Sequence, residues 1–204
     1  MDLLSRAHII KYHNDSIKKF GVNSHQALGW RKKNEQLLRF KMLLEPTELN
    51  DYSVLDIGCG TGDLLAYLIS KNIQCKYTGI DHIKDFITLA GEKYKNQNNT
   101  SFLLGDFWTA DLGKYDYVLV SGALSYRNAD PNFIYKMIAH LFSLSKKTFA
   151  FNLLEKTDLK NGGLVAYNKN EILEFCKKLS SNVILKNDYI INDYSINMKQ
   201  LEIL

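Results

Sequence analysis

VLDIGCGTGD, residues 54–63, is followed directly by LLAYLI, residues 64–69. An apolar run reaches three glycines spaced by two and then resumes with apolar residues at helical spacing, which predicts a strand, a tight loop and a helix. Gly58, Gly60 and Gly62 lack side chains, so the backbone can take positive φ angles and a ligand can approach the first N–H groups of the helix. The stretch therefore predicts a ligand-binding turn.

The residues around this turn favour a cation over a phosphate. The dinucleotide pattern G-x-G-x-x-G needs a small residue at position 63, which is Asp63, and the Gly-Lys-Ser/Thr of a P-loop is absent. The carboxylates of Asp56 and Asp63 flank the loop and would repel a pyrophosphate. They would attract a zwitterionic amino acid that carries an ammonium and a nearby sulfonium.

Three further predicted strands end in polar residues. Lys76–Ile80 ends at Asp81, Ser101–Leu104 ends at Gly105-Asp106-Phe107, and Tyr115–Val120 ends at Ser121-Gly122-Ala123-Leu124-Ser125-Tyr126. A carboxylate such as that of Asp81 at a strand end suits a ribose diol. The simpler alternatives are that Asp81 caps a helix over residues 82–90 and that Gly105-Asp106 is only a turn.

Taken in this order, the four segments resemble class I S-adenosylmethionine-dependent methyltransferases over about residues 51–155. The resemblance implies S-adenosyl-L-methionine as the cofactor, with its methionine half on the segment from Val54 to Gly62. It further implies an adenine site at the third strand end. The cofactor contacts expected on this basis are Asp56, Gly58, Cys59, Gly60, Asp81, His82, Asp106, Phe107 and Ser121.

The fold implied is α/β: a Rossmann-like, doubly wound, mostly parallel seven-stranded sheet with a C-terminal antiparallel hairpin and an N-terminal helical lid. Thr148–Leu154 reads as a fifth strand, and Val183–Tyr189 with Ser195–Ile203 reads as the hairpin. The length of 204 residues and 46% hydrophobic content fit one domain overall. Within it, residues 1–50 form the expected lid or cap segment and residues 51–204 the cofactor-binding part.

The lid segment is expected to contain two helices, Ser5–Phe20 and Gln36–Leu44. Trp30, between them, shields the sulfonium or stacks on the acceptor, or it instead anchors the segment to the sheet. Family resemblance makes Arg39 a candidate for gripping the methionine carboxylate. His13, on the apolar stripe Ile9, His13, Ile17 and Phe20, is either a core histidine or a base.

Contacts to the methyl acceptor are expected from the loop after the fourth strand and from the lid. Tyr126 and Arg127 in that loop, together with Tyr12, are the substrate candidates, and an arginine suits a carboxylate or phosphate. The loop lacks the Pro-Pro of methyltransferases that act on nucleobase amines. If a base is needed, the candidates are His13, His25 and Tyr126; no metal-ligating cluster or catalytic triad is indicated.

All of the formal net charge of +4 belongs to residues 1–50, which hold nine Lys/Arg and five Asp/Glu. These charges form either a solvated face or a funnel for an anionic acceptor. The preferred function is methyl transfer to a small molecule, possibly anionic. The alternatives are an RNA methyltransferase, favoured by the basic segment, and a cofactor-binding protein without transferase activity.

The remaining features exclude other classes. Cys59, Cys75 and Cys176 are scattered and indicate neither a disulfide framework nor a zinc site, and Cys59 reads as a small filler of the loop. No apolar run is long enough for a membrane span and no signal peptide is evident, so a cytoplasmic protein is expected. No coiled-coil heptad points to a particular oligomeric state.

Overall fold

The computed structural model describes residues 2–30, 32–45, 48–157 and 163–201, and these form a seven-stranded sheet in the order β3-β2-β1-β4-β5-β7-β6. The strands are β1 (Ser53–Ile57), β2 (Lys76–Asp81), β3 (Thr100–Leu104), β4 (Tyr115–Val120), β5 (Ser145–Leu154), β6 (Asn182–Lys186) and β7 (Asp193–Lys199). Neighbouring strands are parallel except β7, which is antiparallel to both β5 and β6. The predicted sheet and C-terminal hairpin are confirmed.

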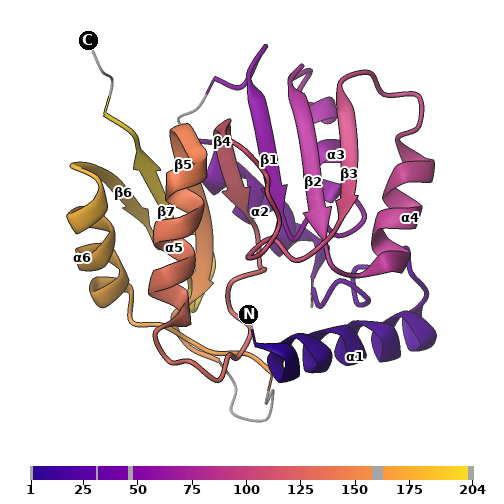
Figure 1. Ribbon diagram of the computed structural model, residues 1–204, viewed down its shortest axis with the longest axis horizontal. Coiled ribbons are helices and arrows are strands. Elements are labelled where there is room, and N and C mark those ends of the chain that lie inside the picture. Colours follow the sequence, from indigo (N-terminus) through magenta and orange to yellow (C-terminus); the bar gives the residue numbers. More distant parts are fainter. Residues whose placement is uncertain (1, 31, 46–47, 158–162, 202–204) are drawn as a thin grey trace.

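Helices cover both faces of this sheet (Figure 1). They are α1 (Leu3–Phe20), α2 (Lys33–Leu44), α3 (Asp63–Ser70), α4 (Lys84–Lys93), α5 (Phe133–Leu144) and α6 (Lys169–Leu179). Helices α5 and α6 lie on one face, α2 and α3 lie on the other, and α4 packs beside β3 and β2. None of the helices within the described part of the chain is long and apolar enough to cross a membrane.

The central strand β1 is buried on both faces, as strands of a parallel sheet are. Successive side chains of a strand point to opposite faces, so Val54 belongs to the same core cluster as Leu64 of α3, while Leu55 belongs to the cluster that contains Ile138 of α5. The sheet order reverses between β1 and β4. Open α/β sheets bind ligands at the carboxyl ends of the strands beside such a reversal.

The N-terminal segment divides between two roles. Helix α1 lies crosswise beyond the carboxyl ends of the strands (Figure 1), which is the place expected of a lid. Helix α2 instead packs against β5 and β7, and its Phe40 and Leu43 are part of the core. Helix α1 and the loop that follows it therefore cover the binding edge, while α2 contributes Gln36 and Arg39 to the cavity wall.

Several predicted boundaries were wrong by a few residues. The helix predicted at residues 82–90 begins at Lys84, β5 begins at Ser145 rather than Thr148, β6 ends at Lys186, and β7 spans 193–199. The chain reverses direction over residues 187–192, where Asn192 takes a positive φ of 64°, and this turn ends β6 early. Phe20, placed on the apolar stripe of α1, is 44% exposed. Residues 202 and 203, at the end of the predicted last strand, lie outside the described residues.

Candidate functional site

A cavity of about 1470 Å³ lies at the carboxyl edge of the sheet, beneath α1. It is larger than the roughly 300–1,000 Å³ of an ordinary small-molecule site. Fourteen predicted site residues line it: Tyr12, His13, Trp30, Arg39, Asp56, Gly58, Cys59, Gly60, Asp81, His82, Phe107, Ser121, Tyr126 and Arg127. Its size fits two ligands held side by side.

The glycine loop after β1 forms one wall of this cavity because its backbone packs tightly against two other segments. Gly58 has a φ of 68°, and a Cβ atom there would lie 2.5 Å from the Cβ of Ala123. A Cβ on Gly60 would lie 2.5 Å from a methyl carbon of Leu28. Both positions therefore need glycine, and the loop brings its bare backbone to the cavity.

Asp56 lies beside this loop, 2% exposed, and accepts a 2.6 Å hydrogen bond from the Tyr77 hydroxyl. Burial raises the pKa of Asp56 to about 7, while the Tyr77 hydrogen bond opposes the shift and the Asp81 and Asp63 carboxylates add to it. A buried carboxyl among like charges is stabilised in its ionised form by a cation. The site therefore suits a positively charged ligand group.

Asp81 ends β2 at the cavity and is held by two backbone groups. One carboxylate oxygen accepts from the Gly60 N–H and the other from the Ile83 N–H, both at 2.9 Å. The alternative role as the N-cap of the next helix is not observed, because Ile83 occupies that position. His82 lines the same wall, and burial lowers the pKa of its imidazole.

The two residues expected at the adenine end are placed differently. Phe107 is 3% exposed and lines the cavity. Asp106 does not line it: its carboxylate accepts from the Trp108 N–H at 2.9 Å and lies 3.9 Å from an Arg6 nitrogen. Asp106 thus shapes the turn after β3 and contacts α1, and its predicted cofactor contact stays a prediction.

Arg39 lines the cavity, and its side chain forms an ion pair with another residue of the protein. Its Nε and Nη2 atoms donate to one oxygen of Asp193 at 2.8 and 2.7 Å, and both residues are buried. The guanidinium also stacks on the Trp30 ring, 4.8 Å from the centroid. A two-pronged grip on a ligand carboxylate would have to replace or share this pair, and the predicted cofactor contact of Arg39 stays a prediction.

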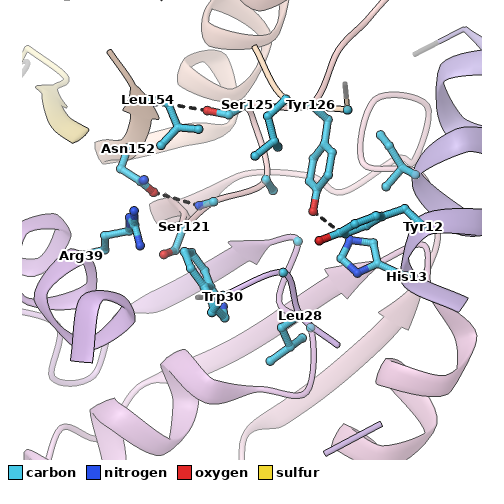
Figure 2. Close-up of a pocket in the computed structure, with 18 of the residues that line it drawn as sticks. Tyr12, His13, Leu28, Trp30, Arg39, Ser121, Ser125, Tyr126, Asn152 and Leu154 are labelled. Carbon is cyan, nitrogen blue, oxygen red and sulfur yellow. Dashed lines mark hydrogen bonds between the residues drawn. The ribbon is translucent and has the colours of Figure 1, made fainter. Parts of the chain in front are cut away.

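Trp30 lines the cavity (Figure 2), and its predicted contact with the sulfonium or the acceptor stays a prediction. A Cβ on Gly122 would lie 2.5 Å from the indole ring, so the indole packs directly on the loop after β4. Ser121 stands beside it, and its Oγ atom is buried without a hydrogen-bond partner among the described residues. Buried polar atoms are normally satisfied, so this orphaned hydroxyl fits a polar ligand.

A buried network that connects this loop to the hairpin was not predicted. Asn152 of β5 accepts from the Gly122 N–H at 2.8 Å (Figure 2). Its amide also donates to Asp193 at 3.4 Å. Asp193 also accepts from the Tyr189 hydroxyl. The sequence could have indicated Asn152 as a site residue, because it is a polar residue inside an apolar strand. It could not indicate Asp193, because a polar residue next to a predicted turn is ordinary.

Tyr12, His13 and Tyr126 meet at another part of the cavity (Figure 2). The Nδ1 atom of His13 lies 2.8 Å from the Ala27 carbonyl oxygen and can only donate to it, so in the neutral ring Nε2 accepts. Nε2 lies 2.9 Å from the Tyr126 hydroxyl, which therefore donates. Burial lowers the pKa of His13, which keeps its imidazole neutral.

Two predicted site residues remain to be placed, His25 and Cys59. His25 does not line the cavity, so the structure does not bring it to the other candidates. Cys59 is buried against Gly79, and burial raises the pKa of its thiol, which matches the predicted filler. Across the described residues, no group of three or more His, Cys, Asp or Glu side chains could hold a metal ion.

The sequence comparisons with known proteins give one consistent class. A family model described as a methyltransferase domain matches residues 55–143. A protein of Mycobacterium tuberculosis whose name suggests a methyltransferase is 26% identical over 73% of this chain and 93% of its own length. The release factor glutamine methyltransferase of Buchnera aphidicola is 30% identical over 53% of this chain, which spans 41% of that enzyme.

A solved structure shares the whole fold. The magnesium protoporphyrin IX methyltransferase of Synechocystis PCC 6803, in a crystal with bound S-adenosylmethionine, superposes with a TM-score of 0.71 over 98% of both chains. Its sequence identity to this chain is 16%, so this likeness concerns the fold.

Proposed function

The chain is a class I S-adenosylmethionine-dependent methyltransferase, and from this premise we propose that it methylates a small, anionic acceptor by direct in-line displacement. One observation carries the proposal: the glycine loop and the Tyr126–His13 pair line a single cavity under a helical lid. A cofactor on the loop and an acceptor beside Tyr126 would then share one enclosed space. Holding two reactants in line can lower a barrier by roughly 7–11 kcal/mol.

The residues present fit S-adenosyl-L-methionine. When bound, it supplies an electrophilic methyl group on a positively charged sulfur. Asp56 would hold its cationic amino acid part, the Asp81 carboxylate would accept from the ribose hydroxyls, and Phe107 would contact the adenine ring. The orphaned Ser121 hydroxyl would complete the set at the methionine end.

Tyr126 and His13 can remove a proton from an acceptor that arrives protonated. The Tyr126 oxygen donates its own hydrogen to His13 Nε2, so its lone pairs are left for the acceptor. As that oxygen takes the acceptor's proton, its own proton moves to Nε2, and the Ala27 carbonyl keeps the imidazole oriented. The Tyr12 hydroxyl lies close by: a Cβ on Gly29 would be 3.6 Å from both tyrosine oxygens.

The anionic character of the acceptor is supported by groups on cavity-lining residues that donate hydrogen bonds and cannot accept them. Arg127 and Lys156 line the cavity and form no ion pair with any carboxylate of the described residues. The Nδ2 atom of Asn128 is buried without a partner in the same part of the chain. An acceptor with a carboxylate or phosphate would satisfy these donors.

The RNA alternative rests on the basic N-terminal segment. Lys18 and Lys19 form the basic last turn of α1 and do not line the cavity, which favours a small acceptor. An assay with methyl-labelled cofactor decides between them: small carboxylates and phosphates are compared with total RNA, at low and high salt. Transfer to RNA that falls steeply with salt would overturn the small-acceptor proposal.

A further inference from the structure

Two aliphatic side chains on the cavity wall are almost fully exposed. Leu4, in the first turn of α1, is 75% exposed, and Ile191, in the turn between β6 and β7, is 89% exposed. They come from opposite ends of the chain and line the same cavity. Single exposed apolar residues are common, but a pair at one cavity indicates contact with an apolar ligand group.

An apolar strip joins the turn that contains Ile191 to the proposed base. Leu164 pairs with Tyr126 in an antiparallel bridge, and the Leu154 N–H donates to Ser125 at 3.3 Å. The Glu155 N–H then donates to the Asn192 carbonyl at 2.9 Å, next to Ile191. Backbone and side-chain hydrogen bonds thus hold Leu164 and Leu154 between Tyr126 and the exposed turn, and both leucines line the cavity.

Cationic and amide donors lie next to the same strip. The Arg127 N–H donates to the Gly163 carbonyl at 2.9 Å, directly before Leu164, and Asn128 follows in the chain with its unpartnered Nδ2 atom. One end of the region therefore suits an anion, and the wall leading outward suits a hydrocarbon.

We propose that the methyl acceptor is an anionic amphiphile with an aliphatic portion, which lies along Leu164 and Leu154 and leaves the cavity between Leu4 and Ile191. The inference rests on the proposed function and narrows its acceptor class. Each methylene group covered by the strip should tighten binding about fourfold. Burial of the exposed leucine and isoleucine under this chain supplies part of that gain.

A displacement assay with n-alkyl carboxylates from butanoate to decanoate tests the proposal. The carboxylates compete with an anionic naphthalene dye whose fluorescence rises in apolar sites, with and without S-adenosylhomocysteine. In the wild type we expect about fourfold tighter binding per methylene group until the strip is covered. Ile191→Asn and Leu4→Asn should flatten this dependence, whereas Arg127→Gln should weaken all chain lengths by one common factor.

Leu3→Asn is the matched control, because Leu3 is 82% exposed in the same helical turn but does not line the cavity. An affinity that does not depend on chain length, or a dependence unchanged in Ile191→Asn, would overturn the inference. Calorimetric binding of S-adenosylhomocysteine to the same samples separates the two claims. If that ligand binds while the chain-length dependence is missing, the amphiphile is wrong and the proposed methyl transfer stands.

Discussion

Replacing Asp193 by alanine should destabilise the protein by about 3 kcal/mol, because it leaves the buried Arg39 guanidinium without a counter-charge. Removal of one partner of a buried ion pair costs roughly 3–5 kcal/mol. Arg39 borders the cavity, where water can reach it, so the lower end of this range applies. The hydrogen bonds from Asn152 and Tyr189 to Asp193 are lost as well.

Urea unfolding followed by circular dichroism measures this loss. With a slope of about 2 kcal/mol per molar urea, the midpoint should fall by about 1.5 M. Glu174→Ala, which breaks the exposed Lys177–Glu174 pair, is the control and should change stability by less than about 0.5 kcal/mol. The double variant Arg39→Met with Asp193→Leu should recover most of the stability. A loss below about 1 kcal/mol in Asp193→Ala would refute the reasoning.

Three further predictions concern the cavity. Because the pKa of Asp56 is raised to about 7, its ionised fraction falls about tenfold from pH 8 to pH 6, and the affinity for S-adenosylmethionine measured by calorimetry should fall with it. Asp56→Asn should bind S-adenosylmethionine weakly at every pH, and a wild-type affinity that does not change with pH would contradict this. Tyr126→Phe should lower kcat about 10²-fold or more with cofactor affinity unchanged, and His13→Gln should act alike; normal turnover in either variant would exclude the proton path. Gly122→Ala, at a φ of 79° and against the Trp30 ring, should lose about 1–3 kcal/mol in urea unfolding, and a variant as stable as the wild type would show that the indole can move.

The sequence predicted the sheet and fourteen of the residues that line the cavity, because each strand is a local apolar run that ends at a polar residue. The glycine loop, Asp56 and Asp81 all follow from that pattern. The side of the sheet to which each residue belongs also follows from alternation, as Val54 and Leu55 show.

Local sequence patterns could not predict which distant residues pair with each other. Arg39 and Asp193 are 154 positions apart, so no spacing in the sequence indicates that they pair. Asp106 was expected at the cofactor because it ends a strand, but Arg6 of α1 and the turn backbone engage its carboxylate. His25 was proposed because it lies just before Leu28-Gly29-Trp30 in a loop that could fold inward, but it does not line the cavity.

The central claim is that the edge of the sheet binds S-adenosylmethionine through Asp81, and calorimetric titration tests it most directly. S-adenosylmethionine and S-adenosylhomocysteine are titrated into the wild type, Asp81→Ala and the control Asp85→Ala, which changes an exposed carboxylate outside this cavity. We expect each ligand to bind the wild type and Asp85→Ala with the same affinity. Asp81→Ala should weaken the binding of each ligand by about 1 kcal/mol or more. No binding of either ligand to the wild type, or equal binding to Asp81→Ala, would contradict the claim.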